Sequence, residues 1–452
     1  MFRFTTDEIL KILFGLLLLI VASGLAGCDD EPESFRFCPN ERKLRLPAAC
    51  DISTPQCQQA VFRAVQCLHD SPMPMPPIRT ISEDEFREEL GVSDTASDTT
   101  EDTSTDTDSA DTDSGEPAIA ENYWDASLHM LGLVTPENTT ATAVNESQAT
   151  AVAAYYSTFY RDVTIISHPG PTHLVDNMYT LAHEFTHAFQ DFEVGLEEQY
   201  ELYSYDDDIQ ISTANSKEGD ATIRGNFALA ILLDYSIESM KISKWYGSWL
   251  SHLQEDIAGN SSPYVPARTS LYYATGPLYV YETFLRSGLD GMNDLRFDFP
   301  TSAVYWMAGY DVSSQNPDAL TEPLQCGKAN PADGFEHSHQ DTFGAAILYA
   351  FLSRTGAALG LDTESAWRLA LQWRGDAIQM FTNPQTKHVA FLWRIRMATP
   401  NDIATLKTIT QNALPQAVIM QPGKELLVFM STDPTMLSPW AASYRCNMTR
   451  EN

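Results

Sequence analysis

The sequence predicts an α+β protein that is mainly α-helical and carries a small sheet. Helices are indicated where apolar residues recur every three or four positions, at 174–202, 214–242, 275–290, 342–358 and 363–382. Strands are indicated by short runs of β-branched and other apolar residues, at 163–166, 389–393 and 426–430. With 452 residues, 43% of them hydrophobic, the chain is long enough for a sizeable core and for two to three domains.

The chain begins with a candidate targeting segment. The apolar run Ile12–Ala26 has 15 residues, which is short for a membrane span and typical of a signal-peptide core. Leu25-Ala26-Gly27-Cys28 resembles the lipobox of bacterial lipoproteins, which implies that residues 1–27 are removed and that Cys28 is lipidated. The expected location is the bacterial cell envelope, with a lipid-anchored protein in the periplasm or on the cell surface. A secreted protein in which Cys28 is incidental is the alternative.

Residues 28–92 are expected to form a small Cys-rich module. Besides Cys28 the chain has six cysteines, namely Cys38, Cys50, Cys57, Cys67, Cys326 and Cys446. An even number in an oxidising compartment favours disulfides. A zinc knuckle is the alternative, but the cluster contains no CxxC pair. Sequence does not determine which cysteines pair.

Residues 93–116 are predicted to be a disordered linker. The segment Asp94–Glu116 contains nine acidic residues, no basic residue and no large apolar residue. Such a segment cannot bury enough surface to offset the entropy lost on ordering. It also lacks the Gly and Glu positions of an EF-hand loop. The linker separates the Cys-rich module from a large domain at 117–452.

The formal net charge is −33. This balance excludes the basic face that a nucleic-acid-binding protein requires, so we expect no nucleic-acid partner. It favours a basic or neutral peptide or protein substrate over a polyanion. Composition leaves the oligomeric state undetermined.

The segment Leu174–Glu193 contains the HExxH pattern His183-Glu184-Phe185-Thr186-His187. On a helix, residues four apart face the same side, so both imidazoles can bind one Zn²⁺, with Glu184 beside the ion. An apolar stripe is expected on the opposite face, made of Leu174, Met178, Leu181, Phe185, Phe189 and Phe192. A surface helix with two unrelated histidines is the alternative, and it does not explain the stripe.

A catalytic zinc site needs a third protein ligand. No His stands in the metzincin register, so an acid is expected, and Glu218 at the start of an apolar helix is the best candidate. Gly219 and Gly225 would let that helix approach the HExxH helix closely. Glu197, Glu198 and Glu201 are competing candidates.

Two blocks carry a family resemblance, HEFTHAFQD at 183–191 and EGDAT at 218–222. Together they resemble the gluzincin class of zinc metallopeptidases, which includes thermolysin-like enzymes. They are closer to a set of bacterial HExxH proteins with a later EGDA block. Weaker matches extend the resemblance over most of 120–410. It implies a zincin-like domain at 117–452 and a Zn²⁺ held by His183, His187 and Glu218. One departure is Met307-Ala308, where such proteins would have His-Pro.

The resemblance also implies roles for the residues. Zn²⁺ would lower the pKa of a bound water and polarise the scissile carbonyl, while Glu184 takes the proton and passes it to the leaving amine. Tyr273 is the chosen donor to the developing oxyanion, with His337 and His339 as competitors and an aromatic core cluster as the alternative for Tyr273. Asp191 and Asp220 are expected to orient a ligand imidazole, although a surface salt bridge would explain Asp191 as well.

These observations predict a lipid-anchored, extracytoplasmic zinc metallopeptidase that hydrolyses peptide bonds. Two alternatives stay open. One is a non-catalytic surface binding or scaffold lipoprotein with a structural or vestigial zinc site, which the missing His at 307 favours. The other is a hydrolase of non-peptide amides, such as a cell-wall crosslink. The tripeptide Arg374-Gly375-Asp376 is interpreted as incidental, within the helix predicted at 363–382.

Overall fold

The structure, a computed structural model, describes residues 37–38, 41–90, 118–135, 139–141, 144–145, 152–167, 173–202, 206–309, 331–332 and 334–444. Several predictions fall outside these residues: the signal peptide 1–27, the lipidation of Cys28, the linker 93–116, and the pairing of Cys326 with Cys446. No helix in the described part of the chain has both the length and the apolar character needed to cross a membrane.

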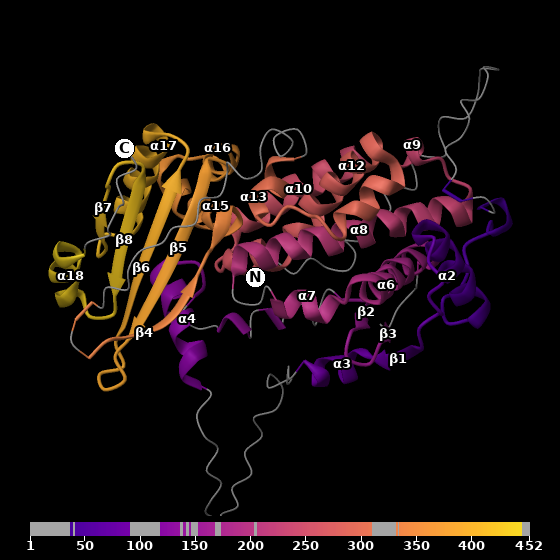
Figure 1. The fold of residues 1–452 in the computed structure, drawn as a ribbon, viewed down its shortest axis with the longest axis horizontal. Coiled ribbons are helices and arrows are strands. Elements are labelled where there is room, and N and C mark those ends of the chain that lie inside the picture. The colour runs from indigo at the N-terminus through magenta and orange to yellow at the C-terminus, as the bar shows by residue number, and fades with distance from the viewer. Residues whose placement is uncertain are drawn as a thin grey trace, which may run out of the picture.

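The fold is α+β and mainly helical, as predicted. The larger of its sheets has five strands. Figure 1 shows this sheet toward one end of the molecule, with the helices α6, α8 and α12 extending toward the other. The helices that carry or surround the HExxH motif are α2 (Pro55–His69), α6 (Leu174–Val194), α7 (Leu196–Leu202), α8 (Asp207–Leu233), α9 (Ile237–Met240), α10 (Ile242–Gly259), α11 (Tyr264–Thr269), α12 (Tyr272–Leu295) and α13 (Ala303–Ala308). The remaining helices are α3 (Glu83–Glu89), α4 (Ala118–Met130), α15 (Gly344–Gly356), α16 (Thr363–Ala370), α17 (Pro400–Ala413) and α18 (Leu437–Ser443), with short 3-10 turns at Glu41–Lys43, Ala357–Leu359 and Pro434–Met436.

Two sheets are present among the described residues. The small sheet has the order β1 (Ile78–Ser82), β3 (Asp162–Ser167), β2 (Ala154–Ser157), with β1 parallel and β2 antiparallel to β3. The large sheet is antiparallel, in the order β4 (Glu336–Asp341), β5 (Trp373–Thr382), β6 (Val389–Met397), β8 (Glu425–Ser431), β7 (Val418–Met420).

Both faces of the large sheet are covered. Along β6, Phe391 and Trp393 enter one core together with α15, whereas Leu392 enters a second core together with Trp440 of α18. This alternation follows from the two-residue period of a strand. A third core holds together α2, α6, α8, α10 and α12, and it forms the back wall of the HExxH helix.

The predicted strands lie within β3, β6 and β8, and the predicted helix at 363–382 is wrong in its second half. Helix α16 ends at Ala370, and β5 begins at Trp373 after a turn. Strand β5 is mostly buried, and its four polar residues, spaced two or three positions apart, show no clear two-residue period. The Arg374-Gly375-Asp376 tripeptide therefore begins a strand, at a register shift, and Asp376 is buried.

The N-terminal segment 41–90 packs directly on the helical half. Its disulfides join Cys38 to Cys67 and Cys50 to Cys57. The ring of Phe62 on α2 contacts those of Phe185 and Phe189 on α6, with centroid separations of 5.3 and 5.6 Å. Strand β1 pairs with β3, so residues that the sequence assigns to a separate module share a core and a sheet with the large domain.

Candidate metal centre

Helix α6 places the HExxH motif on its inner side. The helix ends at Gly195, whose left-handed φ of 70° a Cβ would disfavour. Met178, Leu181, Phe185 and Phe189 are buried, as the stripe predicts. Its two ends are not, because Leu174 is 38% exposed and Phe192 is 57% exposed. The buried stripe is thus shorter than predicted. It covers the part of α6 that packs in one core with α2 and α8.

Three side chains converge where α6 meets α8. His183 Nε2 lies 3.0 Å from His187 Nε2 and 3.1 Å from Glu218 Oε2. His187 Nε2 lies 3.4 Å from the same Glu218 oxygen. Among the residues that the structure describes, this is the one group of His, Cys, Asp or Glu side chains whose ligand atoms are close enough to hold a metal ion.

Comparison with family models, curated proteins and solved structures finds no match.

The competing acids lie elsewhere. Glu197 and Glu198 are exposed on α7, and the side chain of Glu201 is outside the described residues. Glu218 lies in the middle of α8, not near its start as predicted, because α8 begins eleven residues earlier at Asp207. The sequence places the acid correctly beside the two histidines but misplaces it along its helix.

The spacing of the three ligand atoms suits a small tetrahedral ion. Bonds of about 2.0–2.1 Å in a tetrahedron separate neighbouring donors by roughly 3.3 Å. The three observed separations run from 3.0 to 3.4 Å. The set of two imidazole nitrogens and one carboxylate oxygen also leaves further coordination positions open to water or substrate.

Gln190 fixes the orientation of His187. Its Nε2 donates to the backbone carbonyl of Lys217 and to Asp220 Oδ2, each over 3.0 Å. Its Oε1 therefore faces His187 Nδ1 at 2.9 Å and accepts a hydrogen bond from the Nδ1–H group. In neutral His187 this contact favours the proton on Nδ1, so the lone pair of Nε2 points toward His183 and Glu218. The sequence interpretation missed Gln190, because Asp191 at the next position lies on the same side of the helix as His187 and was chosen instead.

The two predicted orienting acids have different positions. Asp220 accepts a hydrogen bond from Gln190, and Gln190 accepts one from His187. Asp220 therefore acts on the imidazole through Gln190 and not directly, as was predicted. Asp191 does not face the ligands at all. It accepts hydrogen bonds from the Tyr156 hydroxyl over 2.9 Å and from the Leu196 amide over 3.0 Å. Its role is to fasten β2 and the start of α7 to the end of α6.

Burial and charge set the protonation of the site. Burial raises the pKa of Glu184, which also accepts a hydrogen bond from the Tyr156 amide. Burial opposes ionisation of Glu218, but His187 and His183 hold the pKa of Glu218 well below its usual range. The pKa of His187 is about 9, since Glu218 outweighs the lowering effect of burial. The site thus favours an ionised Glu218 next to a buried Glu184 that binds protons more readily than a free glutamate.

The aromatic side of the site differs from the prediction. Tyr273 is 39% exposed and packs on Tyr272, with ring centroids 4.7 Å apart. Tyr272 is less exposed and interacts electrostatically with Glu218: burial raises its pKa, and the charge of Glu218 raises it further. His337 and His339 are on β4 of the large sheet, where His339 pairs with Asp341. Met307 is buried in the core beneath α15.

The two glycines of α8 serve different contacts. A Cβ on Gly225 would come within 3.1 Å of the Tyr179 ring on α6, in line with the predicted close approach. A Cβ on Gly219 would instead lie 2.6 Å from the backbone of Gly276, on α12. The prediction for Gly219 is therefore corrected. Gly219, the residue after Glu218, permits the close approach of α12 and not that of α6.

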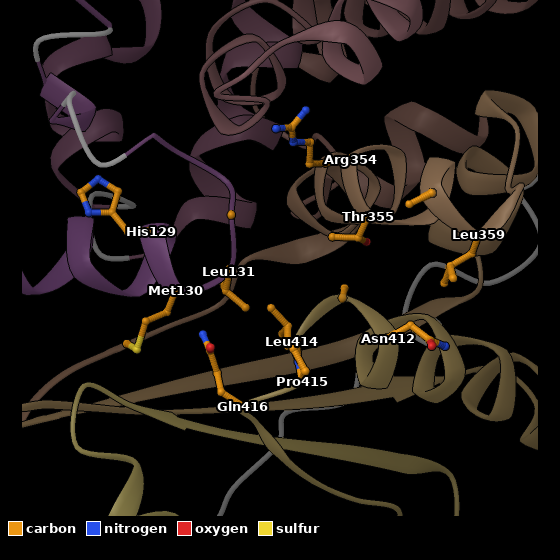
Figure 2. A pocket seen from close by; sticks show the side chains of 13 residues that line it. His129, Met130, Leu131, Arg354, Thr355, Leu359, Asn412, Leu414, Pro415 and Gln416 are labelled. Carbon is orange, nitrogen blue, oxygen red and sulfur yellow. The ribbon is translucent and has the colours of Figure 1, made fainter.

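One surface pocket lies apart from these residues. It has a volume of about 370 Å³ and is found where α4, α15 and α17 end (Figure 2). His129, Arg354, Thr355, Asn412 and Gln416 supply polar side chains to its wall, and no residue of the metal triad lines it.

Proposed function

We propose that this protein is a zinc metallopeptidase with a zincin-like catalytic domain, anchored by lipid outside the cytoplasmic membrane. The observation that carries the proposal is the convergence of His183, His187 and Glu218 with Glu184 adjacent on α6. A purely structural zinc site has no need of a buried carboxylate beside it. The anchor and the location rest on the sequence resemblance at residues 1–28.

Each residue has a task in peptide hydrolysis. Bound by His183, His187 and Glu218, Zn²⁺ would act as a Lewis acid on the scissile carbonyl and on water. Glu184 accepts the proton of the attacking water and delivers it to the leaving amine, since it lies between the two candidate histidine ligands on α6. Gln190 keeps His187 in the tautomer that presents Nε2. Tyr272 is better placed than Tyr273 to donate to the developing oxyanion.

A non-catalytic binding or scaffold lipoprotein is the second candidate. Met307 favours this candidate. The proteins that the sequence resembles would have His at this position, and the Met307 side chain is buried in a hydrophobic core. The buried Glu184 opposes it.

The test combines metal analysis with one substitution. The purified chain is expected to hold one zinc and to cleave members of a peptide library, with loss of cleavage on chelation and recovery on adding zinc. Glu184→Gln should retain zinc and lower kcat by at least about 100-fold, since it removes the base but no ligand. The matched control is Glu197→Gln, an exposed glutamate on α7, which should cleave as the wild type does.

Three outcomes decide among the candidates. A metal-free chain after zinc-replete expression would contradict the metal site. A zinc-bound chain that cleaves no peptide would support the scaffold. Undiminished turnover in Glu184→Gln would remove Glu184 from the mechanism.

A further inference from the structure

A chain of buried hydrogen bonds leads from a metal ligand to the N-terminal segment. It begins at His187 Nδ1, 2.9 Å from Gln190 Oε1, and continues from Gln190 Nε2 to Asp220 Oδ2 over 3.0 Å. Asp220 Oδ1 accepts from Arg224 Nε over 2.7 Å. Arg224 Nη1 then donates to the backbone carbonyl of Leu68 over 2.7 Å. We call this the His187 relay; it connects α6, α8 and α2.

The far end of the relay is the C-terminus of α2, which ends at His69. Carbonyls at a helix C-terminus carry partial negative charge and favour cations. Two guanidinium groups meet there, because Arg296 Nη1 contacts His69 Nδ1 at 2.9 Å. Arg224 and Arg296 also both donate to Asn293 Oδ1, each over 2.7 Å. Burial, Arg224 and Arg296 lower the pKa of His69, so this imidazole is neutral and accepts.

The relay is almost completely shielded from water. Gln190 and Arg224 are 0% exposed, and Asp220 is 2% exposed. Burying an ion pair such as Arg224–Asp220 is expensive, and apolar residues in its place are often neutral for stability or stabilising. Folding stability alone therefore does not account for it. Control of a ligand imidazole does, because partners behind a metal-binding histidine fix its tautomer and ring orientation.

We propose that Gln190, Asp220 and Arg224 are positioning residues of the metal centre, and that α2 of the N-terminal segment is the fixed end of their relay. The inference rests on the proposed metal site. The disulfide from Cys38 closes on Cys67, the residue before Leu68, so it holds the accepting carbonyl in place. The N-terminal segment is thus a working part of the centre, although it supplies no ligand.

The first experiment breaks the relay in the full chain. Arg224→Met should raise the Kd for Zn²⁺, measured by competition with a chromophoric chelator, by about 10- to 100-fold. In the Co²⁺-substituted protein, the visible d–d bands should shift, because the direction of the His187 ring changes. Gln190→Met should produce the same shift, and it provides a second reading if Arg224→Met does not fold.

The matched control is Arg394→Met. Arg394 is also a buried arginine paired with a carboxylate, since its Nη2 lies 2.7 Å from Glu425 Oε1 in the large sheet. The control should lose stability to a similar degree and leave the Kd and the Co²⁺ bands unchanged. Equal shifts in both variants would mean that general destabilisation moves the metal site, and would overturn the proposal.

The second experiment tests the fixed end. Removing the disulfide with Cys38→Ser and Cys67→Ser should weaken Zn²⁺ binding in the wild-type background. It should add little in the Arg224→Met background, because both changes interrupt one path. Additive losses, or no loss from removing the disulfide, would exclude α2 from the relay.

The outcomes separate this inference from the proposed function. A wild-type chain that binds no zinc overturns both. A wild-type chain that binds one zinc with a Kd insensitive to Arg224→Met and Gln190→Met overturns the relay alone. Zinc binding that depends on the relay without any peptide cleavage retains the relay and overturns the peptidase.

Discussion

At the scale of single residues, the neighbours Tyr272 and Tyr273 differ in their exposure to solvent. Tyr272 is buried enough, and close enough to the charge of Glu218, for its pKa to be raised. Tyr273 directs much of its side chain to solvent. A tyrosine with a raised pKa keeps its proton over the working pH range, which a hydrogen-bond donor requires.

Removing each hydroxyl separately tests this assignment. Tyr272→Phe should lower kcat by about 100-fold without changing zinc content, because it removes one donor to the transition state. Tyr273→Phe is the matched control and should retain wild-type kcat. Steady-state kinetics on one cleaved peptide measures both, and a larger loss in Tyr273→Phe would reverse the assignment.

Sequence could identify the three candidate ligands that converge in the structure, but not the residue behind them. His183, Glu184 and His187 follow from helical spacing alone, and the acid at 218 follows from the second block. Spacing could not choose between Gln190 and Asp191, since positions three and four residues after His187 face the same side. Tertiary contacts determine which residue orients His187. Asp191 accepts a hydrogen bond from Tyr156 of β2, whereas Gln190 donates one to Asp220 of α8.

At the scale of elements, the crossing of α8 and α12 positions Glu218. Gly219 and Gly276 bring the two backbones together directly after the ligand. In an exposed or roomy part of a helix, alanine is preferred over glycine by about 0.5–1 kcal/mol. Gly219 is retained against that preference because the crossing leaves no space for a methyl group.

Two alanine substitutions should therefore have opposite effects. Gly247→Ala lies in α10 with no atom within 4 Å of the new Cβ, and it should raise the free energy of unfolding by about 0.5–1 kcal/mol. Gly219→Ala should lower it by about 1–3 kcal/mol through overpacking, and should weaken zinc binding by displacing Glu218. Urea titrations and chelator competition measure these effects. A Gly219→Ala protein as stable as Gly247→Ala would refute the close crossing.

The one segment discussed above whose element type was mispredicted is the second half of 363–382, which forms β5. Strand β5 is covered on both faces, by α15 and by α18. Its four polar residues are spaced two or three positions apart, so the sequence does not show the two-residue period that would indicate a strand. Packing of the N-terminal segment on α6 and α8 was also not predictable, because it depends on contacts between distant parts of the chain.

At the scale of the whole molecule, buried carboxyl groups lie where α8 meets the large sheet. Burial raises the pKa of Asp208 from 3.8 to about 7, and that of Asp341 from 3.8 to about 6. Burial likewise raises the pKa of Asp376, which accepts a hydrogen bond from Trp393. Asp208 accepts from the Ala303 amide. These groups hold protons in the folded state at pH values where an unfolded chain has released them.

This difference makes the contribution of these groups to stability fall as pH rises. Between about pH 4 and pH 7 they bind more protons in the native state than in the unfolded state, so their contribution to the free energy of unfolding decreases with pH. Asp208 alone accounts for a few kcal/mol, at about 1.4 kcal/mol per pKa unit. Asp208→Asn keeps an oxygen for the Ala303 amide and cannot ionise. Its stability relative to wild type should therefore increase between pH 5 and pH 8.

Urea unfolding of both proteins at the two pH values measures that change, with other titrating groups cancelling in the difference. The control is Asp298→Asn, an exposed aspartate, for which the difference from wild type should not depend on pH. A difference for Asp208→Asn that is constant with pH would show that Asp208 is ionised in the native state.

Helix α8 extends through both halves of the molecule. Its first turn is held by the Thr342 carbonyl and the Asp341 carboxylate, and near its end Leu232 accepts a hydrogen bond from the Leu46 amide. On the proposed export, in which the N-terminus leaves first, all three candidate ligands emerge well before residue 341. We therefore expect the candidate metal centre to become ordered only after residue 341 has followed. The proposed hydrolysis would then begin only outside the compartment in which the cell's own proteins are made.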